Sequence, residues 1–352
     1  MAYKENYDNM AAAVSELSGG ENVVLMDDMD KPGIYVPIPK MLNSELIKGG
    51  SSNVHPAFMV GGVEKPCFYY SKYQNVVINK RAYSLARRDP ATYVTYDQAK
   101  TYCDNKGAGF HLSSQAEWAA IALLTRMMGT MPHGNNQFGH DSAYPYEKGQ
   151  EASHEGSGDT YKINRVLTGS GPATWGHDHT KFGIQDLNGN IWEWQTGLRL
   201  VDGEIQIIPY NNAALGADCD TGSSSTLWKA ISKSGSLVTP GTAGTLKYGA
   251  SNSLVTAKPD TSVTNWSSFA AMGIESGLTA PELAKALILY PDEPNGDYGG
   301  DYHGWNCQGE RVAHCGGPWN AGGFAGVFSV DLGDPRSNSF GGGIGFRSAF
   351  IA

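Results

Sequence analysis

The segment FGIQDLNGNIWEW, residues 182–194, carries the clearest structural signals in this chain. Asn188, Gly189 and Asn190 favour a turn, because asparagine and glycine tolerate left-handed backbone conformations. We expect Trp192 and Trp194 to point in different directions, so that one enters the core while the other covers a loop. The segment therefore predicts a tight turn that leads into a strand.

Two helix starts precede this turn. In GFHLSSQAEWAAIA (109–122), Ser114 and Glu117 have the spacing of a capping box, in which each side chain satisfies a backbone N–H of the other. This helix is expected to run to about Met128. Thr95 and Gln98 repeat the pattern and predict a helix to about Asn105.

The C-terminal stretch GGPWNAGGFAGVFSVDLGDPRSNSFGGGIGFR occupies residues 316–347. Its many glycines indicate turns and irregular loops. Arg336 and Arg347 carry planar guanidinium groups with five donors, which suit them to hold irregular backbone in place. We expect a structural role for both arginines.

Taken in order, these segments resemble the signatures of the formylglycine-generating-enzyme branch of the C-type lectin fold. The first is similar to the family's Ala-Glu-Trp motif, the second to its Gly-Asn-x-Trp-Glu-Trp motif, and the third supplies GGPW, RSNS and GFR. The resemblance spans residues 93–347. It implies an α+β fold in which two helices pack with small antiparallel sheets and extensive irregular loops.

The rest of the chain is organised around this domain. Residues 1–50 read as an N-terminal segment, with a helix over 5–18 and strands from residue 22 onward, that serves attachment or oligomerisation. Residues 51–352 form the lectin-fold domain, with an insertion at about 197–300 and a variable region at about 316–347. Within the insertion, LRLVDGEIQIIP predicts a strand pair, and Thr279 with Glu282 predicts a third capped helix to about Tyr290.

Composition and charge argue against several kinds of partner and location. The net charge is −9 and no basic run occurs, which argues against a nucleic-acid partner. No stretch approaches the roughly 18 apolar residues of a membrane span, so no membrane insertion is expected. The N-terminus MAYKENYDNM lacks the pattern of a secretory signal peptide.

The family resemblance raises the alternative of a sulfatase-modifying-factor-type oxidoreductase. Such enzymes carry a redox cysteine pair shortly after the GGPW-like motif, and the matching positions here are Ala321 and Gly326. Neither residue can ligate a metal or act as a nucleophile. A calcium-dependent sugar lectin is a third alternative, but its Glu-Pro-Asn and Trp-Asn-Asp triplets do not occur. We therefore expect a binding module and no enzyme activity.

The C-terminus also resembles the variable proteins of diversity-generating retroelements, whose frame is similar to GGxWNNGxNAGVFxxNLNNxRSNxNNNIGFR. The departures fall where that pattern has asparagine, a residue whose AAT and AAC codons these retroelements mutate at adenine. Changes at those adenines cannot produce Lys, Glu, Gln, Met or Trp, and residues 320–347 contain none of the five.

This resemblance implies a ligand-binding surface at residues 320–342, on a rigid frame that includes the core residues Trp192 and Phe346. Phe324 and Phe340 would be exposed aromatic anchors; the alternative is that they are ordinary core aromatics. The predicted ligand-binding positions are Asn320, Ala321, Gly323, Phe324, Asp331, Gly333, Asp334, Ser339, Phe340, Gly341 and Gly342.

The implied function is receptor recognition by a phage tail component or a cell-surface adhesin. The partner would be a macromolecule, either a host surface protein or a glycan. A site built to vary carries no lasting signature of its ligand, and the oligomeric state is equally open.

No cofactor is required for such a function, but the sequence contains three candidate metal sites. In calcium-bearing relatives the ligands come from positions that match Asp186, Gly189, Ile191 and Glu193, with two carboxylates and two backbone carbonyls. The other interpretation is a turn closed by hydrogen bonds. Two weaker metal candidates are Cys307 and Cys315 with His314, and the 177–179 triplet His-Asp-His.

Overall fold

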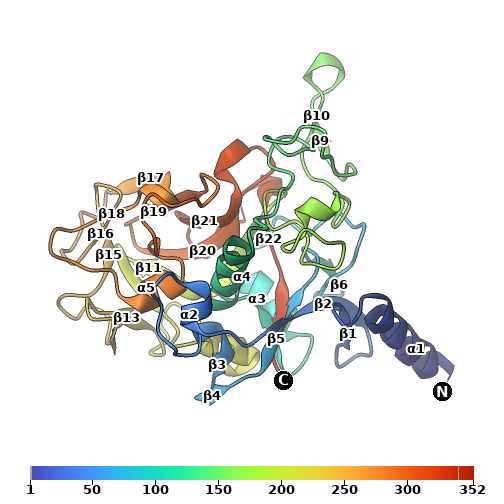
Figure 1. Cartoon of the computed structure of the whole chain (residues 1–352), viewed down its shortest axis with the longest axis horizontal. Coiled ribbons are helices and arrows are strands. Elements are labelled where there is room, and N and C mark those ends of the chain that lie inside the picture. The colour runs from blue at the N-terminus through green and yellow to red at the C-terminus, as the bar shows by residue number, and fades with distance from the viewer. Residues whose placement is uncertain (1, 340) are drawn as a thin grey trace.

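The computed structural model describes residues 2–339 and 341–352 and has an α+β fold with few helices (Figure 1). The helices are α1 (Ala2–Leu17), α2 (Asn43–Leu46), α3 (Tyr96–Asp104), α4 (Gln115–Met128) and α5 (Glu282–Ala286). Irregular loops connect small sheets, so the fold class expected from the sequence is confirmed.

The strands are short, and most of them belong to one of two sheets. Their bounds are β1 (Val23–Met26), β2 (Pro32–Pro39), β3 (Met59–Val60), β4 (Val63–Glu64), β5 (Cys67–Ser71), β6 (Val76–Ile78), β7 (Arg81–Tyr83), β8 (Phe110–Leu112), β9 (His154–Glu155), β10 (Lys162–Ile163), β11 (Trp192–Val201), β12 (Glu204–Ile207), β13 (Lys229–Ile231), β14 (Leu237–Val238), β15 (Lys247–Tyr248), β16 (Ser253–Val255), β17 (Thr264–Ser268), β18 (Gly273–Ile274), β19 (Tyr302–Asn306), β20 (Glu310–Gly316), β21 (Gly326–Leu332), β22 (Ile344–Phe346) and β23 (Ser348–Phe350).

The smaller sheet, in the order β1-β2-β5-β23-β8, brings the two ends of the chain together. The larger sheet contains the path β17-β19-β21-β20-β11-β12. Strands β12 to β18 come from the predicted insertion. Within it β11 and β12 form the expected strand pair, with Asp202 and Gly203 both at positive φ in the connecting turn. The division into an N-terminal segment and a domain with an insertion stays a prediction.

The two capped helices are confirmed. Thr95 and Gln98 form a capping box at the start of α3, and Ser114 and Glu117 form one at the start of α4. Gly129 ends α4 in the left-handed conformation. Helix α1 is also formed and projects from the body in Figure 1, with Gly19 and Gly20 at positive φ after its last turn.

The third capping box is wrong. Helix α5 begins at Glu282, is preceded by Pro281 without a side-chain cap, and ends at Ala286, short of the predicted Tyr290. The Glu282 carboxylate instead accepts hydrogen bonds from the Ser51 backbone N–H and hydroxyl and from Asn43. A contact with distant sequence has replaced the local cap.

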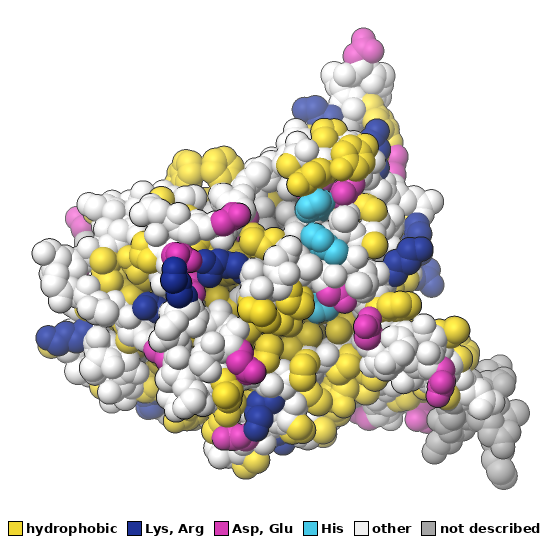
Figure 2. Space-filling view, viewed as in Figure 1, with side chains coloured by type: hydrophobic (Ala, Val, Ile, Leu, Met, Phe, Trp, Pro, Cys, Tyr) yellow, Lys and Arg dark blue, Asp and Glu magenta, His cyan; other side chains and the backbone are white. Residues whose placement is uncertain are grey.

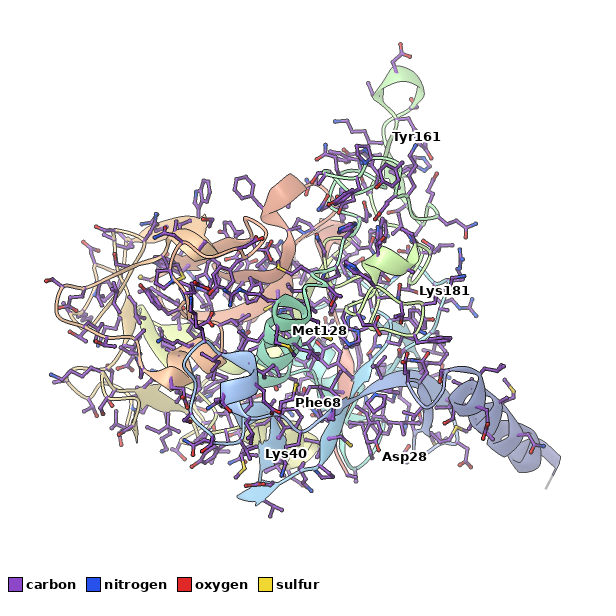
Figure 3. The ribbon with its side chains drawn as sticks, in the orientation of Figure 1. Asp28, Lys40, Phe68, Met128, Tyr161 and Lys181 are labelled. Atoms are coloured by element: carbon purple, nitrogen blue, oxygen red, sulfur yellow. The ribbon has the colours of Figure 1, made fainter. Side chains whose placement is uncertain are left out.

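Trp118 of α4 is buried and links the Ala-Glu-Trp motif to the C-terminal stretch 316–347. Its indole Nε1 donates to the carbonyl oxygen of Val327 at 2.7 Å. A Cβ on Gly316 would lie 3.2 Å from the Trp118 ring, so the first glycine of GGPW allows this close approach. Phe68 of β5, labelled in Figure 3, belongs to the same core, whereas Tyr161 lies on the projecting segment near β10.

Arg347 is the most extensively bonded buried side chain of the frame. It donates to Glu193 at 2.7 Å and to the backbone carbonyls of Ser71, Lys72, Gln185 and Asp186. Both charged side chains are buried. Arg336 acts similarly nearer the surface, where it pairs with Glu310 and Asp97. The structural role expected of both arginines is confirmed.

We predict that Arg347→Met lowers the free energy of unfolding by about 3–5 kcal/mol, because it leaves Glu193 as a buried charge without its cation. Urea unfolding measures the change. Arg88→Met is the control, since Arg88 is exposed, and it should change stability by less than about 0.5 kcal/mol. Equal effects of the two substitutions would contradict the structural role of Arg347.

Candidate ligand-binding surface

The turn and strand of residues 186–194 position one wall of the candidate surface. Gly189 and Asn190 have positive φ, as the sequence predicts. Trp194 is fully buried, and its indole N–H donates to the Val94 carbonyl at 3.0 Å. Trp192 is only partly buried and lines an open groove. The expectation that Trp192 is a core residue is therefore wrong, and Trp194 takes that place.

This groove has a volume of about 800 Å³ and combines segments from across the C-terminal region. Its lining residues are Trp192, His314, Pro318, Trp319, Asn320, Asp331, Asp334, Pro335, Ser337, Asn338, Gly341, Gly342, Gly343 and Ile344. Five of the predicted ligand-binding positions are among them: Asn320, Asp331, Asp334, Gly341 and Gly342. The fold thus brings residues from both halves of the 320–342 segment to one concave surface.

Exposure separates the predicted variable positions from the frame around them. Each of the ten described positions is exposed or partly exposed: Asn320, Ala321, Gly323, Phe324, Asp331, Gly333, Asp334, Ser339, Gly341 and Gly342. The intervening frame residues Ala325–Val330, Leu332 and Ile344–Arg347 are buried. Phe324 is 49% exposed, so the alternative that it is a core aromatic is excluded. Phe340 lies outside the described residues.

An acidic pair forms the floor of the groove. Asp334 accepts a hydrogen bond from His314 Nε2 at 2.9 Å, and Asp331 lies 4.0 Å from the same nitrogen. Burial raises the pKa of Asp331, an effect that the His314 charge opposes and the Asp334 charge reinforces. Burial raises the pKa of Asp334, but the hydrogen bond and charge of His314, the hydrogen bond from Asn338 and the charge of Arg311 together lower it. Asp334 therefore also supports buried His314.

Aromatic side chains border the groove along the sheet. Trp192, Tyr302, Trp266 and Phe324 follow one another with ring centroids 5.6–6.2 Å apart, and we call these four residues the aromatic ridge. Trp266 is 54% exposed. Hydrophobic side chains protrude from the upper edge of the molecule above β17, the strand that carries Trp266 (Figure 2). Neither Trp266 nor Tyr302 is among the ligand-binding positions predicted from the sequence.

The positions that would carry redox cysteines do not suit that chemistry. Gly326 has no room for a side chain, because a Cβ there would lie 2.2 Å from the carboxylate of buried Asp301. Asp301 is held in place by the Phe328 backbone N–H, which donates to it at 2.7 Å. A cysteine at Gly326 would require Asp301 to move, so the scaffold itself departs from the enzyme arrangement at this point.

The predicted calcium ligands do not fit a cation in their present arrangement. Glu193 accepts from Arg347 and Gln74, and Asp186 accepts from the Gly169 backbone N–H. Arg347 already supplies the positive charge beside both carboxylates. The second Asp186 oxygen is buried without a partner, and burial raises the pKa of this carboxyl to about 6. Calcium binding at Asp186, Gly189, Ile191 and Glu193 stays an untested prediction of the sequence.

The other metal candidates are used in internal contacts. Cys307 contacts the Tyr248 carbonyl, whereas Cys315 contacts Gln115. His177 accepts from the Ile184 backbone N–H and His179 bonds to the Met131 carbonyl. Within residues 2–339 and 341–352, no group of three or more His, Cys, Asp or Glu side chains is placed to hold a metal ion.

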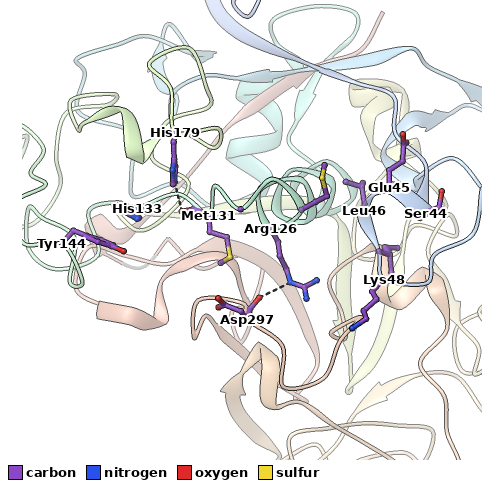
Figure 4. A pocket seen from close by; sticks show the side chains of 13 residues that line it. Ser44, Glu45, Leu46, Lys48, Arg126, Met131, His133, Tyr144, His179 and Asp297 are labelled. Carbon is purple, nitrogen blue, oxygen red and sulfur yellow. Dashed lines mark hydrogen bonds between the residues drawn. The ribbon is translucent and has the colours of Figure 1, made fainter.

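A second cavity, of about 690 Å³, lies beside the end of α4 (Figure 4). His133 and Tyr144 stack at one end of it, residues 44–48 line the other end, and Arg126 donates to the Asp297 carbonyl between them. None of the ten described ligand-binding positions lines this cavity. Among the described residues no helix is long and apolar enough to cross a membrane.

These features define an α+β scaffold with a groove lined by residues of the C-terminal region. Residues 48–202 match the family described as sulfatase-modifying factor enzyme 1-like domain, which confirms the resemblance to the formylglycine-generating-enzyme branch. The match covers less than half of the chain and ends before residues 316–347. No curated protein sequence matches the chain.

Three solved structures are distantly similar to the chain, and in each case the match covers 94% of it. Treponema denticola variable protein 1 is 12% identical with a TM-score of 0.35, and 99% of it is covered. The Major Tropism Determinant P3c variant is 11% identical with a TM-score of 0.33 and 71% covered. PvdO from Pseudomonas aeruginosa is 15% identical with a TM-score of 0.32 and 98% covered.

We predict that excess EDTA leaves the melting temperature unchanged and that added calcium raises it by less than about 1 °C, because Arg347 occupies the position of the cation. Differential scanning calorimetry with and without EDTA makes the measurement. A calcium-dependent rise of several degrees that Glu193→Gln abolishes would restore the calcium site.

Frame and surface should respond differently to substitution. Phe324→Ser, Asn320→Tyr and Ser339→Tyr should each change the free energy of unfolding by about 0.5 kcal/mol or less, as exposed positions usually do. Trp194→Ala and Phe346→Ala should cost about 3–5 kcal/mol, since both aromatic side chains are buried. Thermal melts of the five variants measure this contrast. A loss at Phe324 as large as that at Trp194 would place Phe324 in the core.

Proposed function

We propose that this protein is a hypervariable ligand-binding protein whose surface at residues 320–342 is diversified by a retroelement. Its function is recognition of a macromolecular ligand, a host surface protein or glycan, by a phage tail component or a cell-surface adhesin. In this proposal the chain performs no catalysis.

One observation carries the proposal. The positions that depart from the asparagine-rich pattern are exposed or partly exposed wherever they are described. The frame residues 325–330, Leu332 and 344–347 are buried, whereas the frame segment 336–338 is not. A segment can vary without unfolding the protein only if its varied side chains stay out of the core. Exposed aromatic, small and polar residues are also the kinds that antibody loops use for contact.

The groove supports the same interpretation. It collects Asn320, Asp331, Asp334, Gly341 and Gly342 on one concave surface next to exposed Phe324. Concave surfaces with a few polar groups and aromatic walls are the usual form of a binding site. The oxidoreductase alternative would need a thiol at Gly326, where Asp301 leaves no space.

The neighbouring DNA gives the direct test. We expect a near-copy of the 3′ coding end beside a reverse-transcriptase gene, differing from the coding copy at template adenines. The differences should fall at codons such as those of Ala321, Phe324 and Asp331 and should spare Val327 and Phe346. A near-copy whose differences fall equally on frame codons, or the absence of any copy in the complete genome, would contradict diversification by a retroelement.

A further inference from the structure

One row of residues crosses five neighbouring strands of the larger sheet. Trp266 of β17 pairs with Gly304 of β19, Gly304 with Asp331 of β21, Asp331 with His314 of β20, and His314 with Trp194 of β11. Residues directly opposite each other on paired strands share one face of a sheet. The predicted variable residue Asp331 therefore lies on the same face as Trp266, which comes from outside residues 320–342.

Gly304 makes room for the aromatic ridge on this face. A Cβ on Gly304 would lie 1.9 Å from Tyr302 Oη, so the Tyr302 ring covers the glycine. Tyr302 stacks on Trp266 with an interplanar angle of 22° and meets Trp192 edge-on. Phe324 in turn meets Trp266 at 83°. Three of the four ridge residues thus lie outside the segment proposed to vary.

The groove beside the ridge is acidic. Asp331 and Asp334 line it, and neither lysine nor arginine is among its described lining residues. Arg165 reaches the rim at the Gly342 carbonyl, but both oxygens of Asp89 neutralise it. Burial and the charges of Asp331 and Asp334 raise the pKa of Tyr302, so the field of both carboxylates extends to the ridge.

Carboxylates beside aromatic faces attract one kind of ligand group in particular. A cation over the face of a tryptophan or tyrosine is attracted by the ring, and a guanidinium also forms paired hydrogen bonds with a carboxylate. Arginine combines both properties in one flat group. A neutral sugar would bring no positive charge to the acidic pair.

We propose that the aromatic ridge and the Asp331–Asp334 pair form one surface that binds an exposed arginine side chain of a protein ligand. This inference rests on the proposed function and narrows its ligand to a protein with a basic surface. Trp192, Tyr302 and Trp266 are the constant part of the surface, and residues 320–342 are the varied part. Trp266 contributes contact area that every variant of the segment would share.

The test uses the full chain and two acetylated, amidated pentapeptides, one with arginine at two positions and one with the neutral isostere citrulline there. Calorimetric titration should show that the arginine peptide binds at least about tenfold more tightly than the citrulline peptide. Asp331→Asn and Trp266→Ala should each weaken binding of the arginine peptide by about fivefold or more. Two control variants carry comparable changes at exposed positions outside the groove: Asp159→Asn removes a carboxylate charge and Tyr146→Ala removes an aromatic ring. Both should leave binding unchanged.

Three outcomes would overturn this inference: equal binding of the two peptides, equal losses in the control variants, or retention of an oligosaccharide at the ridge in place of the arginine peptide. Thermal melts of the same variants establish that each one is folded. If the genome carries the expected template copy and the two peptides still bind equally, the proposed function stands and the arginine surface fails. If the copy is absent and the arginine peptide binds as described, the diversification fails and the surface stands.

Discussion

The buried pair of Arg347 and Glu193 is the interaction on which the rest of the structure depends. Through four backbone carbonyls Arg347 also holds the end of β5 and the loop before the central turn. It therefore ties the strands β5 and β11 to the loop before the central turn. Because a buried charge is costly without its partner, the pair tolerates few alternative arrangements. Such rigidity is what an exposed variable segment requires.

The same constraint explains how the surface is built. Strand β22 pairs with β11 in parallel, which sets Gly345 opposite Glu193, two residues before Arg347. Trp192 and Trp194 are two residues apart on β11 and share one face, where both rings contact His314. Trp194 packs with α3 residues in the core, whereas Trp192 lies at the groove. Asp331 and His314 face each other on the adjoining strands. The frame thus determines where the surface begins, and the residues at its edge are free to differ without loss of the core.

Local signals were predictable from the sequence, and contacts between distant segments were not. The capping boxes at Thr95 and Ser114 involve residues three apart, and both form. The third one fails because Glu282 bonds to Ser51, 231 residues away. The expectation that Trp192 and Trp194 point in different directions is wrong, because residues two apart on a strand share one face. Packing against Tyr96 of α3 buries Trp194. Trp266 was not predictable because its place beside Asp331 depends on the register of β17 and β19.

The central claim is that a rigid frame carries a surface that is free to vary, and a pair of libraries tests it most directly. One library randomises Asn320, Ala321, Gly323, Phe324, Gly333, Ser339, Gly341 and Gly342 with residues reachable from asparagine codons; the other randomises eight buried frame positions in the same way. Protease resistance of displayed variants measures the folded fraction in each library. The account predicts that most members of the first library remain folded and that nearly all members of the second do not. Equal folded fractions in the two libraries would contradict it.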